Sequence, residues 1–224
     1  MDFSRVIKKC ITPIFCLGVS MYFTWIVGNY ATKRDIDRNT EPLYDVIHAN
    51  TEKINPAIVD WILVVDQLIF IPYLIYIYKK NRNFNVYERY CFFTAFIFLI
   101  RSLCIYVTSL PNPEKCSIDD HHIAIFRLSV MYCGDMMFSG HVSHFTISVL
   151  FFTHFNKSTK ARFFVWILVP VYMFMVSMSR LHYTIDVLVS FFINVLGWFS
   201  MLYLFPIKNR VQQVHSLDSI LSWG

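Results

Sequence analysis

The sequence predicts an all-α protein, a polytopic membrane bundle of six transmembrane helices. Hydrophobic residues make up 56% of the chain and aromatic residues 18%, while only 16% are charged. That balance is typical of a membrane protein and unusual for a soluble domain of 224 residues. The apolar residues gather in six runs, and no polar stretch between them exceeds about one loop. We therefore expect one membrane domain over residues 1–224.

The six runs have the length that a membrane span requires. A hydrocarbon core of about 30 Å needs roughly 20 apolar residues in a helix. The segments lie at about 11–31, 57–78, 90–110, 137–156, 163–180 and 183–206. The first follows three basic residues, as a signal peptide would, but it is long and no small-residue cleavage pattern follows it, so we expect an uncleaved span. The last two are nearly contiguous, which predicts a tight helical hairpin.

The positive charges predict an orientation for these spans. With six crossings, 12 Lys and Arg residues fall on one side and 7 on the other. The side richer in Lys and Arg is normally cytosolic. Both termini are therefore expected in the cytosol, and the loops before the fourth and sixth spans in the lumen or outside the cell.

Composition and spacing also exclude some functions. The net charge of +5 forms no basic stripe with exposed aromatic residues, which argues against nucleic-acid binding. The six cysteines lack zinc-ribbon spacing, and the Asp-Asp-His-His run at 119–122 is typical of a solvated loop, so we expect no metal and no cofactor. Cys116 and Cys133 flank one polar loop, and whether they form a disulfide stays open.

His182 and Asp186 are expected to begin the sixth span. Residues four apart share one face of a helix, so Asp186 can hold one imidazole nitrogen and leave the other facing outward. This arrangement makes a histidine a nucleophile or a base. Asp186 also precedes an apolar run, where an acid needs a partner.

A second histidine, His141, follows a Ser139-Gly140 step at the top of the fourth span. The small step lets backbone approach a ligand, and amides at a helix start suit an anionic phosphate. A capped helix followed by an interfacial histidine is the alternative. The charge count places both histidine motifs on the same, non-cytosolic face.

An arginine within the third span, Arg101, is a further anomaly. It could bind phosphate, extend to the interface, or pair with Asp66 of the second span. Asp135, Ser139, Gly140, Arg180 and Tyr183 join Arg101 as candidates for binding substrate or phosphate. Asp60 is expected only near the lumenal interface, and His48 in an ordinary loop.

These residues resemble the sphingomyelin synthase family, the ceramide phosphotransferases of the type-2 phosphatidic acid phosphatase superfamily. The strongest blocks are residues 133–141 and 182–187, joined by a block at 101–113 and a degraded form of the family's first block at 41–45. Four blocks in order make the match specific, and it covers roughly residues 40–206.

The resemblance implies six helices, with His141, His182 and Asp186 as the catalytic triad at a lumenal or extracellular site of the Golgi or plasma membrane. Family members move a phospho-head group from a glycerophospholipid to ceramide, release diacylglycerol and need no metal. We expect His182 to attack phosphorus and form a phosphohistidine, His141 to act as acid and then base, and Arg101 and Arg180 to balance phosphate charge.

Two rival functions remain as alternatives. A lipid phosphate phosphatase usually has an Arg-Pro motif upstream and an arginine several residues before its nucleophilic histidine. Here no Arg-Pro occurs, and Arg180 lies only two residues before His182. A non-catalytic membrane lipid binder would be expected to lose at least one of the three triad residues. The head group stays open among choline, ethanolamine and inositol, because residues 179–182 look more like the inositol-phosphorylceramide synthases of plants and protists than the animal enzymes. The oligomeric state is open as well.

Overall fold

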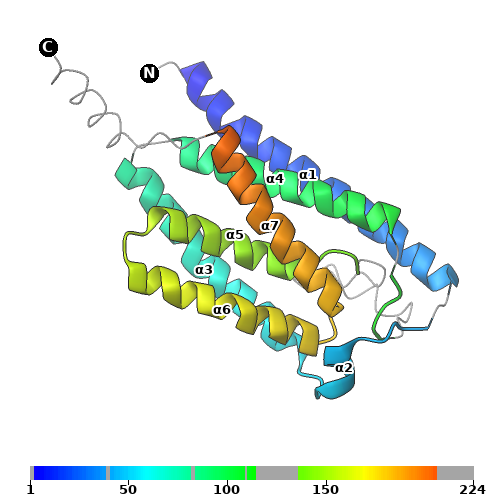
Figure 1. Ribbon diagram of the computed structural model, residues 1–224. Helices are drawn as coiled ribbons and strands as arrows, with labels where there is room; N and C mark the ends of the chain where they lie inside the picture. The colour runs from blue at the N-terminus through cyan, green and yellow to red at the C-terminus, as the bar shows by residue number, and fades with distance from the viewer. Residues whose placement is uncertain (1–2, 39–40, 82–83, 109, 115–135, 206–224) are drawn as a thin grey trace, which may run out of the picture.

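The computed structural model describes residues 3–38, 41–81, 84–108, 110–114 and 136–205 (Figure 1). Within these ranges the chain forms seven helices and no strand, which confirms the all-α prediction. The helices are α1 (Phe3–Arg38), α2 (Val46–Asn50), α3 (Pro56–Asn81), α4 (Phe84–Val107), α5 (Gly140–Phe155), α6 (Thr159–Met178) and α7 (Thr184–Leu204).

Five of these helices, α1, α3, α4, α6 and α7, are long and apolar enough to cross a membrane. The chain is therefore a multi-pass membrane protein. The fourth expected span, 137–156, corresponds to α5, which has only 16 residues and so extends about 24 Å. It begins later than predicted because the side chain of Ser139 caps it by accepting a hydrogen bond from the backbone N–H of Val142. Nine residues of α5 are buried, so a count of six spans is compatible with this short, enclosed helix.

The other helix boundaries also differ from those of the predicted apolar runs. Helix α1 continues to Arg38, well past residue 31, because its polar end contains no glycine or proline to stop it. Helix α4 starts at Phe84 rather than near residue 90. The predicted hairpin is present, since α6 ends at Met178 and α7 begins at Thr184. The short helix α2 was not predicted.

Helix α5 occupies the middle of the bundle and packs against α3, α4, α6 and α7, while α1 packs along α4. In Figure 1 the starts of α5 and α7 lie at the end of the bundle that also holds α2. The interior is aromatic beyond that end: the ring of Phe151 contacts that of Trp198, with centroids 4.7 Å apart.

A buried ladder of polar side chains holds α5 against α7. The backbone N–H of Ser139 donates to the hydroxyl oxygen of Ser190 at 2.6 Å, and that hydroxyl donates to the carbonyl of Asp186 at 2.6 Å. Deeper in the bundle, Asn194 donates to the hydroxyl of Ser143 at 3.0 Å. Small polar residues of this kind let helices approach closely and bond across a membrane interface. The ladder fixes the start of α5 relative to the start of α7.

Candidate active site

The first histidine motif lies at the start of α5. Gly140 is its first helical residue, and a Cβ placed there would lie 3.5 Å from Nε of Arg101. Arg101 itself is only 8% exposed, and its Nε donates to the carbonyl of Phe138 at 3.1 Å. The buried guanidinium of Arg101 therefore lies directly beside the motif.

Asp66 takes no part in this arrangement, contrary to the pairing with Arg101 that was one of the alternatives. Its carboxylate accepts hydrogen bonds from Ser148 at 2.8 Å and from Gln67 at 2.8 Å. It lies six residues further along α3 than Asp60, the acid that does reach the site. The polar partners on α3 and α5 satisfy Asp66 within the bundle.

His141 has a carboxylate partner that the sequence analysis missed. Its Nε2 lies 2.8 Å from Oδ1 of Asp60, which stands in the second turn of α3. The two side chains are 17% and 28% exposed. A usable signal was present, because Asp60 is an acid inside an apolar run at a membrane boundary, as Asp186 is.

His182 lies outside the helix in which it was expected. Helix α7 begins only at Thr184, so His182 belongs to the short connection from α6. Its Nδ1 is nevertheless 3.8 Å from Oδ2 of Asp186, and the two side chains are 7% and 0% exposed. The distance is that of an ion pair, longer than a hydrogen bond.

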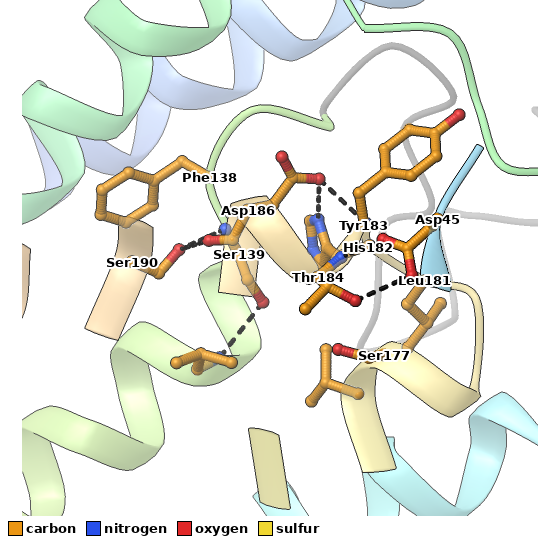
Figure 2. Close-up of polar contacts among 12 residues, drawn as sticks. Asp45, Phe138, Ser139, Ser177, Leu181, His182, Tyr183, Thr184, Asp186 and Ser190 are labelled. Carbon is orange, nitrogen blue, oxygen red and sulfur yellow. Dashed lines mark hydrogen bonds and ion pairs between the residues drawn. The ribbon is translucent and has the colours of Figure 1, made fainter. Parts of the chain in front are cut away.

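The side chain of Asp186 also stabilises the start of α7. The same Oδ2 accepts a hydrogen bond at 3.0 Å from the backbone N–H of Tyr183, the residue that precedes α7 (Figure 2). A side chain three residues into a helix that reaches back to the capping residue stabilises the helix start. The carboxylate that faces His182 is therefore held by the beginning of the helix that carries it.

The imidazole ring of His141, on α5, lies edge-on to that of His182, on the α6–α7 connection. Their centroids are 6.2 Å apart and the ring planes meet at 67°. Each ring has its own carboxylate, Asp60 for His141 and Asp186 for His182. The tertiary structure thus brings both sequence-predicted motifs together at one end of the bundle, between two acids.

Arg180 and Tyr183, two of the candidate binding residues, contact the connection between α1 and α3. Arg180 has a φ of 58°, which costs a residue other than glycine roughly 1–2 kcal/mol, and its Nη2 donates to the carbonyl of His48 at 3.4 Å. The hydroxyl of Tyr183 accepts a hydrogen bond from the backbone N–H of Leu43 at 3.0 Å. Both side chains are therefore engaged by protein groups next to His182.

His48 is no ordinary loop residue. Its Nε2 lies 3.2 Å from the carbonyl oxygen of His182, and its ring stacks on that of Tyr183 with centroids 5.6 Å apart. No sequence signal indicated this, because 134 residues separate His48 from His182.

A neighbouring acid of the same connection, Asp45, caps α2 and bonds to Thr184. Burial alone would raise the pKa of Asp45, but the hydrogen bonds from Thr184 and His48 outweigh it and lower that pKa below its usual value.

Several predicted positions lie outside the described residues: Asp135, the run at 119–122, Cys116 and Cys133. In the part of the chain that is described, no three His, Cys, Asp or Glu side chains are grouped in a way that could hold a metal ion.

The chain is similar to proteins of known class. Residues 132–204 match the family model "PAP2 superfamily C-terminal". The chain is 25% identical over 206 residues to phosphatidylcholine:ceramide cholinephosphotransferase 1 of Caenorhabditis elegans, covering 78% of this chain and 41% of that one. It is 31% identical over 136 residues to phosphatidylinositol:ceramide inositolphosphotransferase of Trypanosoma cruzi, covering 52% and 39%.

A third relative is the phosphatidylethanolamine:ceramide ethanolaminephosphotransferase of Trypanosoma brucei brucei (strain 927/4 GUTat10.1), 28% identical over 129 residues, with 52% of this chain and 40% of that one covered. The chain thus spans about two fifths of the length of these curated relatives. The names of the three differ in head group and agree in ceramide. With the match to the PAP2 superfamily model across the motif region, they make this chain similar to ceramide phosphotransferases of the PAP2 superfamily.

Proposed function

We propose that this chain transfers a phospho-head group from a glycerophospholipid to ceramide and releases diacylglycerol. The observation that carries the proposal is the pair of imidazoles with centroids 6.2 Å apart, each beside a carboxylate, at one end of a membrane bundle. That separation suits a phosphorus atom held between a nucleophile and a proton donor, at the roughly 3–3.5 Å that attack requires. The names of the relatives supply ceramide as the acceptor.

In the first half-reaction, Nε2 of His182 attacks phosphorus while Nδ1 faces Asp186. The bond between phosphorus and the diacylglycerol oxygen breaks, and His141 gives that oxygen a proton. The products are diacylglycerol and a phosphohistidine that carries the head group. Asp186 favours the positive charge that develops on the imidazole.

In the second half-reaction, His141 takes the proton from the primary hydroxyl of ceramide. The ceramide oxygen then attacks phosphorus, and the bond to His182 breaks, which restores the enzyme. His141 therefore alternates between acid and base, and its Nε2 contact with Asp60 holds the ring for both steps. The buried guanidinium of Arg101 balances the charge on the phosphate oxygens.

The decisive experiment reconstitutes the protein in liposomes with fluorescent ceramide and one donor at a time: phosphatidylcholine, phosphatidylethanolamine or phosphatidylinositol. A new fluorescent phospholipid supports the transferase and identifies the head group. Water-soluble head group or phosphate released without a new lipid would instead indicate a phosphatase, and no turnover a lipid binder. His182→Ala should abolish transfer, by on the order of 10³-fold or more, while the protein stays folded in the membrane.

We also propose that the site faces the lumen or the exterior of the Golgi or plasma membrane, with both termini in the cytosol. Tyr44, which is 80% exposed near the site, offers a test of this orientation. In intact cells, Tyr44→Cys should react with a membrane-impermeant maleimide, whereas Lys79→Cys, at the other end of α3, should react only after permeabilisation. The opposite pattern would reverse the orientation.

A further inference from the structure

The connection between α1 and α3 contacts the α6–α7 connection through one carboxylate. Oδ2 of Asp45 accepts a hydrogen bond from the backbone N–H of Thr184 at 2.7 Å, and Oδ1 accepts one from the hydroxyl of Thr184 at 2.8 Å (Figure 2). Oδ1 also accepts from the backbone N–H groups of Ile47 and His48, at 2.9 and 3.2 Å. Asp45 therefore fixes the start of α2 and the start of α7 to each other.

Residues of the α1–α3 connection also bond to His182 and Tyr183, the two residues that precede Thr184. Nε2 of His48 lies 3.2 Å from the carbonyl of His182, and the backbone N–H of Leu43 donates to the hydroxyl of Tyr183 at 3.0 Å. The backbone of the proposed nucleophile and the two residues after it are thus bonded to residues 43–48, which we call the 43–48 segment.

These contacts matter because His182 lies outside any helix. A loop residue has no i→i+4 ladder to fix its backbone, and a displacement of about 1 Å at a reacting group can lower a rate on the order of 10²-fold. Asp186 contacts the ring of His182 and the amide of Tyr183. Two further places near the nucleophile are the carbonyl of His182, and the amide and hydroxyl of Thr184. The 43–48 segment supplies the contacts at those two places.

We propose that Asp45 and His48 are positioning residues that hold His182 at the phosphorus. The inference rests on the proposed transferase function and adds to it two residues, separated by more than 130 positions from the histidine they orient. Neither residue exchanges a proton with substrate. Each acts on the backbone next to the nucleophile.

The first test is Asp45→Asn, which replaces one acceptor oxygen by an amide NH₂ and leaves two donors facing each other at Thr184. The kcat of transfer should fall about 10- to 100-fold, with KM for donor and ceramide within about twofold. Formation of the phosphohistidine in a single turnover should slow by the same factor. Glu52→Gln is the matched control, because Glu52 is an exposed acid of the same connection, and it should keep wild-type activity.

A double-mutant cycle separates positioning from a general loss of folding. Thr184→Val replaces the hydroxyl by a methyl group and should lower the kcat of transfer. Thr184→Ser keeps the hydroxyl and should keep activity. The hydroxyl of Thr184 bonds to Asp45, so its loss should add nothing once Asp45 is changed, and the double variant should be no slower than the worse single variant. Thermal unfolding in detergent reports folding independently. Wild-type kcat in Asp45→Asn would overturn the proposal. The proposal would also be overturned if the two effects on kcat add fully in the double variant and follow the loss of folded protein.

A second readout does not depend on transfer. Mass spectrometry can follow the modification of His182 by diethyl pyrocarbonate, which is slow for a side chain 7% exposed. Asp45→Asn should accelerate it several-fold and Glu52→Gln should not. If the wild-type chain transfers no head group but Asp45→Asn still alters His182 reactivity, the transferase proposal fails and the positioning role stands. Unchanged reactivity in both variants would refute the positioning role.

Discussion

The two histidine–carboxylate pairs differ in range, distance and exposure. His182 and Asp186 are four residues apart in sequence, 3.8 Å apart in space, and 7% and 0% exposed. His141 and Asp60 are 81 residues apart, joined at 2.8 Å, and 17% and 28% exposed. One pair is local, buried and loosely joined, and the other is long-range, accessible and tightly joined.

This difference agrees with the separate roles that the proposed mechanism gives to the two histidines. A nucleophile that carries a covalent intermediate benefits from burial, which keeps water away from the phosphohistidine. A histidine that exchanges protons with two lipid substrates in turn needs access to both. The local pair therefore suits attack on phosphorus, and the long-range pair suits general acid–base work.

The largest effect should come from the buried pair. Asp186→Asn removes the negative charge beside the imidazole that becomes positive during attack. Transfer to fluorescent ceramide should fall on the order of 10³-fold. Because Asn can still accept a hydrogen bond from the amide of Tyr183, circular dichroism should show the helix retained. More than a tenth of wild-type activity would remove Asp186 from the nucleophile's machinery.

The accessible pair should give a smaller effect. In Asp60→Asn, His141 keeps its position but loses a charged partner, and kcat should fall about 10- to 100-fold. Asp66→Asn is the matched control on the same helix, since Asp66 contacts Ser148 and Gln67 instead. Equal losses in both variants would contradict a specific role for Asp60.

A milder change tests the space beside His141. The Cβ of Gly140→Ala would meet the guanidinium of Arg101 at 3.5 Å, an ordinary contact distance. Activity should drop by no more than about threefold, equivalent to well under 1 kcal/mol. Gly18→Ala, where nothing lies within 4 Å of the added Cβ, should leave activity unchanged. A loss above tenfold would mean that backbone or substrate, rather than a side chain, occupies that space.

The smallest effect should appear in the pH dependence of stability near His182. Since hydrogen bonds lower the pKa of Asp45 in the folded state, its contribution is present above the ordinary Asp pKa of about 3.9. It should be lost as pH falls through the lower, folded value. Thermal unfolding in detergent should therefore show Asp45→Asn less stable than wild type at pH 7, with the gap closing toward pH 3. A gap independent of pH would contradict this linkage.

Sequence patterns were sufficient for the local pair and for most of the spans. The i,i+4 spacing of His182 and Asp186 and the apolar runs are properties of neighbouring residues. The same patterns placed His182 inside the helix, which was wrong. Helix α7 starts only at Thr184, where the backbone N–H of Tyr183 donates a hydrogen bond to the side chain of Asp186. The patterns also made α5 too long, since Ser139 ends the preceding loop as a cap.

The sequence by itself determined a membrane bundle, the resemblance to ceramide phosphotransferases and the two histidine motifs, because hydropathy and short spacings act between residues close in the chain. Only the tertiary structure decided that Asp60 pairs with His141 and that Asp45 and His48 reach the α6–α7 connection. Those contacts join residues 81 to 139 positions apart. They depend on how α3, α5 and α7 pack, and no periodicity in one segment encodes the packing of another.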